Sequence, residues 1–184
     1  MIFENVSPEN TVVALKIAFE KATELSTDVV VSTTSGASAA EAVKHAADVS
    51  FQGKVIVVTH VWGMKTIGEN ELLDEHRKTL EDAGAIIVTA AHALSGTERA
   101  MSGKFGGVYP IEVMAHTLRL FCQGVKVCVE IATMALDAGA IKEPRPVVAL
   151  GGTGSGLDTA CVITPGYSAK IFETRVHEIL CKPY

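Results

Sequence analysis

The sequence predicts an α/β fold in which helices cover both faces of a mostly parallel sheet, a three-layer αβα arrangement with an antiparallel edge strand. Short β-branched runs such as Val29, Val30 and Val31 recur without alternating polar residues, which is typical of strands covered on both faces. Segments with helical apolar spacing separate these runs, and the connections are short. Because 48% of the 184 residues are hydrophobic and no segment has linker composition, we expect a single domain over residues 1–184.

Helices and strands are predicted to alternate in the first half of the chain. Ser7 before a proline is a typical helix start, and Ser38 begins a capping box with a glutamate three residues later. Gly84 ends a third helix whose start is rich in acidic residues. The strands between these helices are expected at residues 28–32, 55–59 and 85–89.

The second half of the chain is less regular. Residues 95–107 hold four glycines and few apolar residues, so we expect a loop that covers a ligand. Pro110 opens a helix that runs to residue 121, and in residues 125–138 the valines favour a strand whereas the length favours a helix. Two short apolar runs, residues 147–150 and 160–164, flank a glycine-rich turn and are expected to pair as antiparallel neighbours.

The last stretch, residues 168–181, is interpreted as a helix because Phe172, Val176 and Leu180 fit helical spacing. Val176 and Leu180 also flank Glu178 in alternation, which leaves a strand as the alternative.

Charge and composition exclude several classes of protein. The net charge is -5 and the basic residues are scattered, whereas a nucleic-acid site needs clustered cations, so we expect no nucleic-acid partner. Neither a signal peptide nor an apolar run of membrane-spanning length is present, which predicts no membrane partner and a cytoplasmic location. The four cysteines lack metal-ligand spacing and are expected to be free thiols, with no metal bound.

A hydroxyl-rich loop between a buried strand and a helix is the first candidate site. Unpaired amides and the positive end of a helix dipole favour an anion at such a junction. Gly36 is expected to let the backbone approach a ligand closely, while the neighbouring hydroxyls donate to phosphate oxygens. The alternative is that these hydroxyls only cap the helix. The predicted contacts are Thr33, Thr34, Ser35, Gly36, Ala37 and Ser38.

A glycine-rich turn at residues 151–156 is the second candidate site. Its glycines can form a concave nest of amides at the same carboxyl ends of the parallel strands. No lysine follows as in a P-loop, and a plain hairpin turn is the alternative. The predicted contacts are Gly152, Thr153, Gly154 and Ser155.

Two further segments are predicted to complete the pocket. Residues after the second strand could form a flat apolar wall with polar contacts, and packing in the core or an interface is the alternative. These wall residues are His60, Trp62, Gly63 and Met64. In the segment 95–107, Arg99 and Lys104 are expected to close over a bound phosphate, unless they are solvated surface charges.

The two loops resemble the C-terminal α/β domain of pyruvate kinase, in which a Thr-x-Ser-Gly-x-Ser loop after a strand holds a sugar-phosphate effector. The matching residues are Thr33, Ser35, Gly36 and Ser38. Residues 152–156 resemble the family's late glycine-rich turn in a shorter form. The resemblance spans most of the chain and is closest to stand-alone archaeal and bacterial proteins of this type. It implies the pyruvate kinase C-terminal domain fold and flavin mononucleotide (FMN) as a cofactor in the corresponding pocket.

The chain departs from the family pattern in two places. Ala37 stands where the kinase loop often has a basic residue, and residues 95–107 have no clear counterpart, so fructose bisphosphate is not the expected ligand. The barrel that carries pyruvate kinase catalysis cannot fit beside this domain in 184 residues. We therefore expect that the chain is not itself a pyruvate kinase.

Three functions are consistent with these residues. The first is binding of a phosphorylated small molecule, with FMN as the expected ligand and the source of any redox chemistry. The second is a regulatory module that senses a sugar phosphate or nucleotide and signals through an oligomer interface. The third is an enzyme with His60 or His92 as acid or base, although no partner for either histidine is evident from sequence spacing. We also expect homo-oligomers.

Overall fold

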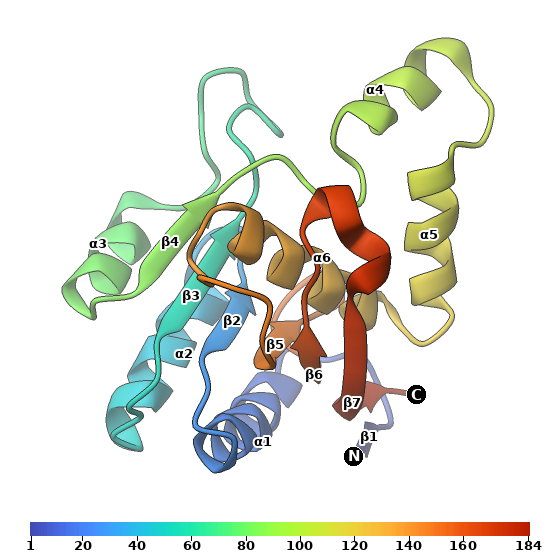
Figure 1. Ribbon diagram of the computed structural model, residues 1–184. Coiled ribbons are helices and arrows are strands. Elements are labelled where there is room, and N and C mark those ends of the chain that lie inside the picture. The colour runs from blue at the N-terminus through green and yellow to red at the C-terminus, as the bar shows by residue number, and fades with distance from the viewer.

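A seven-stranded sheet forms the centre of the molecule, and the computed structural model describes all 184 residues (Figure 1). The strands follow the order β1-β7-β6-β5-β2-β3-β4 across the sheet. They are β1 (Ile2–Phe3), β2 (Val29–Ser32), β3 (Val55–Thr59), β4 (Ile86–Thr89), β5 (Val147–Gly151), β6 (Thr159–Thr164) and β7 (Arg175–Pro183). Only β6 runs against the others, because it pairs in antiparallel fashion with both β5 and β7. The expected mostly parallel α/β fold is confirmed, and the antiparallel strand expected at the edge is β6, with β7 and β1 outside it.

Six α-helices and one 3-10 helix connect these strands. They are α1 (Asn10–Glu24), α2 (Ala37–Asp48), α3 (Asp74–Asp82), α4 (Gly96–Phe105), α5 (Pro110–Arg119), α6 (Gln123–Asp137) and the 3-10 helix η1 (Ser168–Glu173). A helical connection follows each of β2, β3 and β4 and leads to the next parallel strand of the chain, as the alternating sequence pattern predicts.

The two faces of the sheet carry separate apolar cores, which gives the three layers. Helices α1, α2 and α3 cover one face, where Phe19 and Leu80 are fully buried. Helices α5 and α6 cover the other face, where Leu136 is buried with the inward side chains of β3 and β5. Strands β2, β3 and β5 lie between both cores, which explains their unbroken runs of apolar residues.

Helix α6 is almost completely buried against the sheet. Its valines made the sequence ambiguous, and the structure confirms the helix that the length favoured. A helix of this kind is apolar around most of its circumference because the sheet and α5 enclose it, so helical periodicity is weak in its sequence.

Residues 95–107 are not the predicted loop, since α4 occupies most of this segment. No residue of α4 is buried, so the helix has no apolar face from which it could be predicted. The Glu98 carboxylate instead accepts hydrogen bonds from the amides of Ile111 (3.2 Å) and Glu112 (2.9 Å) at the start of α5. Figure 1 shows that α4 and α5 form an arm beside the sheet.

The predicted C-terminal helix is also wrong. Residues 168–173 form the short η1 turn, and β7 then pairs with β6, with two register shifts. Exposed residues dominate the first half of β7, so burial did not impose a clear alternation on the sequence. Strand β1 pairs with β7 at the edge, in the register Ile2 to Lys182.

None of the helices combines the length and the apolar character that crossing a lipid bilayer requires.

Candidate functional site

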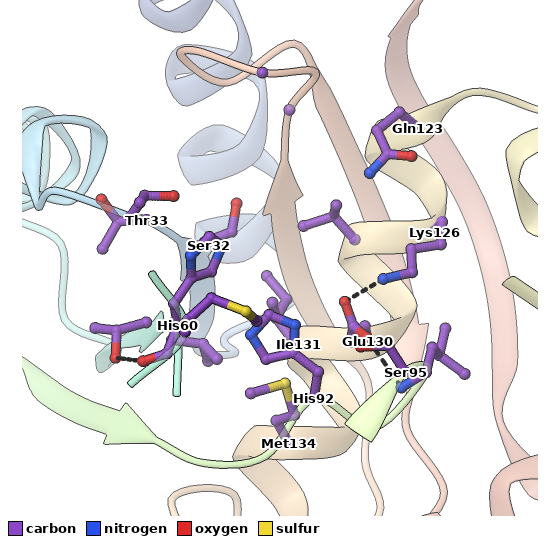
Figure 2. Close-up of a pocket in the computed structure, with 18 of the residues that line it drawn as sticks. Ser32, Thr33, His60, His92, Ser95, Gln123, Lys126, Glu130, Ile131 and Met134 are labelled. Atoms are coloured by element: carbon purple, nitrogen blue, oxygen red, sulfur yellow. Dashed lines mark hydrogen bonds and ion pairs between the residues drawn. The ribbon is translucent and has the colours of Figure 1, made fainter. Parts of the chain in front are cut away.

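A cavity of about 800 Å³ opens at the carboxyl ends of the parallel strands. The loops after β2, β3 and β4 line one side, the glycine-rich turn after β5 lines another, and α4, α5 and α6 complete the wall. Figure 2 shows His60 and His92 together within it, between Thr33 on one side and the α6 residues on the other. The volume lies within the range of about 300–1,000 Å³ that is usual for small-molecule sites.

The loop after β2 turns the first amides of α2 towards this cavity. Thr33 Oγ1 accepts a hydrogen bond from the Gly36 amide (3.0 Å), and the Ser38 hydroxyl lies 3.1 Å from both Ser32 O and Thr33 Oγ1. These two hydroxyls therefore brace the loop, and neither caps α2 as the alternative interpretation held. The amides of residues 37–39 donate no hydrogen bond within the protein. Those of Ala37 and Ser38, on the cavity lining, are the donors that an anion at this loop would meet.

Gly36 has a different role from the expected one. It does not line the cavity, and its φ of +102° is in the left-handed region. A Cβ atom on this residue would lie 2.4 Å from His76 Cβ and 2.7 Å from Leu72 Cδ1. The Ser35 carbonyl next to it accepts hydrogen bonds from the Leu73 amide (3.0 Å) and His76 Nδ1 (2.9 Å). Gly36 is required for packing against the start of α3, not for contact with a ligand.

The predicted capping box at Ser38 is wrong as well. Helix α2 begins at Ala37, with Gly36 as its N-cap and no side-chain cap. Ser38 therefore lies inside the first turn, where its hydroxyl reaches back to β2. Loop closure by Thr33 replaces the cap that the spacing suggested.

The glycine-rich turn is held by its own carboxylate. The buried Asp158 accepts a hydrogen bond from the Thr153 amide (3.1 Å) and another from the Thr159 hydroxyl (2.7 Å). A Cβ atom on Gly152 would lie 2.1 Å from Gly156 O, so that position admits only glycine. Gly154 faces open space with φ at +76°. The turn is a compact rim of the cavity, with Gly152 and Gly154 on its lining.

Beyond β3 the two predicted wall residues with large apolar side chains differ in their surroundings. Met64 lines the cavity, whereas Trp62 does not and is 58% exposed. The apolar part of the wall comes instead from the β4–α4 connection and α6, with Leu94, Ile131 and Met134 (Figure 2). His60 lies on the lining, and its Nδ1 is 2.7 Å from Glu71 Oε2.

A buried ion pair on α6 forms the opposite wall. Lys126 donates to Glu130 one turn away, and the other oxygen of Glu130 accepts a hydrogen bond from the Leu94 amide (2.9 Å). His92 is near this pair, and its ring centroid is 5.1 Å from that of His60. Burial lowers the pKa of His92 below its ordinary value, and the Glu130 carboxylate offsets only part of this effect. Burial therefore favours the neutral form of the His92 ring.

The lining carries as many cations as carboxylates. The cations are Lys65, Arg99, Arg119 and Lys126, and the carboxylates are Glu71, Glu98, Glu112 and Glu130. Lys126 is paired with Glu130, whereas Lys65, Arg99 and Arg119 form no ion pair, and Arg119 donates to Gln123 Oε1 (2.7 Å). The lining is therefore formally balanced, in contrast to the net charge of -5 of the whole chain.

The structure brings most of the predicted contacts to one cavity. On its lining are Thr33, Thr34, Ser35, Ala37, Ser38, His60, Met64, Arg99, Gly152, Gly154 and Ser155. Five predicted contacts do not line it, namely Gly36, Trp62, Gly63, Lys104 and Thr153. Lys104 lies instead over the Phe105 ring, 5.6 Å from its centroid.

Sequence reasoning missed Glu71, Arg119, Gln123, Lys126 and Glu130. Only the α6 pair left a usable signal, because opposite charges four residues apart interrupt an otherwise apolar segment. Glu71 lies in the connection before α3 and faces His60.

Comparison with known families agrees with this architecture. The pyruvate kinase alpha/beta domain matches residues 13–163, from within α1 to within β6. The matched region contains β2 to β5, both candidate loops and all residues of the cavity wall. The chain is thus a member of the pyruvate kinase alpha/beta domain family.

Proposed function

We propose that this protein binds a phosphorylated small molecule in the cavity and that FMN is the ligand. The observation that carries the proposal is the pair of unpaired amides at Ala37 and Ser38, which begin α2 on the cavity lining. Helix N-termini bind phosphate because unpaired amides and the helix dipole act together. Lys65 and Arg99 on the same lining form no ion pair, so both are free to contact a phosphate.

FMN suits the remainder of the lining. Its flat ring system needs an apolar surface, and Leu94, Ile131 and Met134 provide one. The ribityl hydroxyls and ring edge need polar partners, which His60, His92 and Gln123 offer. When bound, FMN would supply redox chemistry that the side chains alone lack.

Self-association is part of the same proposal. The α4–α5 arm exposes Phe105, Val108, Leu120 and Phe121, and exposed apolar surface is typical of protein–protein interaction sites. Because the arm also forms one wall of the cavity, a partner subunit that covers it would stabilise the site.

The test uses a variant that prevents a phosphate from binding to these amides without disturbing the fold. Ala37 is exposed at the first position of α2, so Ala37→Asp places a carboxylate where the helix dipole favours it. The same carboxylate repels a phosphate by about 4 kcal/mol at 4 Å and an effective dielectric constant of about 20. FMN affinity, measured by quenching of flavin fluorescence, should fall at least tenfold.

The control is Thr97→Asp, which adds the same charge to the first turn of α4 at a residue that does not line the cavity. It should leave FMN affinity within about twofold of wild type. The visible absorbance of freshly purified protein gives an independent readout, because bound FMN would show the absorption bands of a flavin. If FMN does not bind and a sugar phosphate or nucleotide does, the regulatory function replaces the flavin one.

A further inference from the structure

His60 is fixed in orientation by two neighbours from the connection between β3 and α3. Its Nδ1 lies 2.7 Å from Glu71 Oε2, and its carbonyl oxygen accepts a hydrogen bond from the Asn70 side-chain amide (2.9 Å). Asn70 Oδ1 in turn accepts a hydrogen bond from the Leu72 amide (2.9 Å). Two adjacent residues thus hold both the backbone and the ring of His60 at the end of β3.

The contact with Glu71 determines the chemistry of the other ring nitrogen. A carboxylate only accepts hydrogen bonds, so the hydrogen of a neutral His60 ring is on Nδ1. Nε2 of the neutral ring then carries a lone pair and is an acceptor. No hydrogen bond within the protein uses Nε2, and the residue lines the cavity. The cavity therefore contains one oriented, unoccupied acceptor.

This acceptor lies next to the anion-binding loop. Strands β2 and β3 pair in parallel with Ser32 opposite Val58, so His60 emerges one strand away from the loop that begins at Thr33. The ring of His92 follows on the other side, from the connection after β4. A ligand whose phosphate contacts the α2 amides would reach His60 with the adjoining part of the molecule.

We propose that His60, oriented by Glu71, accepts a hydrogen bond from a hydroxyl or N–H group of the ligand and selects phosphorylated molecules that carry such a donor. The inference rests on the proposed function, because it assigns the unphosphorylated part of the same ligand. FMN meets the requirement through its ribityl hydroxyls and its ring N–H.

The decisive comparison uses FMN and inorganic phosphate as probes with three variants. His60→Phe keeps a planar ring but removes the acceptor, so FMN affinity should fall about tenfold or more, the size of a lost buried hydrogen bond. Inorganic phosphate, detected by the rise in melting temperature, should bind within about twofold of wild type. His60→Gln supplies an acceptor without a titratable ring and should restore part of the affinity. His177→Gln, on β7, is the control.

Glu71→Gln offers a readout without ligand, since nitrogen NMR should show the Nδ1–H tautomer of His60 in wild type and a mixture in this variant.

The outcomes separate this inference from the proposed function. If wild-type protein binds neither FMN nor phosphate, the proposed function fails. If it binds both and His60→Phe retains wild-type FMN affinity, only the inference is overturned. Equal loss of FMN and phosphate affinity in His60→Phe also overturns it.

Discussion

Lys126 and Glu130 form an ion pair one helical turn apart, with only 7% of each side chain exposed, in the wall of the cavity. Removing one partner leaves a charge buried without compensation, which typically costs about 3–5 kcal/mol. We expect Glu130→Ala to lower the free energy of unfolding by about that amount in urea denaturation. The double variant Lys126→Met with Glu130→Gln removes both charges and keeps an acceptor for the Leu94 amide. It should be more stable than Glu130→Ala, and the reverse order would contradict the assignment.

Gly36 and Gly154 provide a matched pair of glycines with positive φ. Gly36→Ala introduces a Cβ atom that would lie 2.4 Å from His76 Cβ, in addition to the cost of φ at +102°. Gly154→Ala introduces backbone strain alone, about 1 kcal/mol, because its surroundings are open. Thermal unfolding should show the larger loss of stability for Gly36→Ala. Similar losses in both variants would mean that α3 moves away to accommodate the new methyl group.

His92 should make the fold less stable in mild acid. Burial lowers its pKa in the folded protein below the value of about 6.5 in an unfolded chain. Below that pH the unfolded chain takes up a proton that the folded protein does not, so the free energy of unfolding decreases as pH falls. Urea denaturation at pH 7.5 and 5.5 should therefore show a smaller decrease for His92→Gln than for wild type. Parallel decreases would place the acid-sensitive group elsewhere.

The four cysteines should differ in reactivity. Burial raises the pKa of Cys181 to about 11 and that of Cys128 well above its ordinary value, and Cys161 is fully buried. Only Cys122 is partly accessible. Iodoacetamide at pH 7.5 should therefore modify the native protein at Cys122 alone, whereas all four should react in urea. Mass spectrometry of the intact protein distinguishes one adduct from several.

The exposed arm gives a test of self-association. Leu120 at the end of α5 is 84% exposed, so Leu120→Glu should leave the melting temperature nearly unchanged while it weakens contact with a second copy. Light scattering should then report a smaller mass than for wild type. Val12→Glu on α1 is the control, because that exposed valine is remote from the arm. An unchanged mass in both variants would exclude the arm as an interface.

The central strands and their helices were predictable because burial imposes a pattern on their residues. Strands β2, β3 and β5 are covered on both sides, so Val29, Val30 and Val31 had no polar neighbours to obscure them. The segments whose secondary structure was predicted wrongly are those that bury few of their residues. Helix α4 has no apolar face, and β7 is exposed over its first half. Neither sequence therefore carries the apolar periodicity that distinguishes a helix from a strand.

The candidate site was predictable where chemistry follows from position in the fold. A hydroxyl-rich loop after a parallel strand lies at the carboxyl edge of the sheet whatever its tertiary contacts, and this placed Thr33 and Ser38 on the cavity. Contacts between distant segments could not be inferred in the same way. Glu71 contacts His60 across a connection of irregular structure. Gly36 packs against His76 of α3, which follows much later in the chain.

The pairing of the first strand with the last brings the two ends of the chain close together, which would allow a circular permutation. The Met1 ammonium group donates to the Leu180 carbonyl (2.6 Å), and the Tyr184 amide donates to the Phe3 carbonyl (2.9 Å). A short linker between Tyr184 and Met1 would therefore join neighbouring ends, and new termini opened at the exposed Gly107 would interrupt no strand. Such a circular permutant would keep every strand pairing of the sheet. It would also break the connection between α4 and α5, so that the two helices of the arm could move independently.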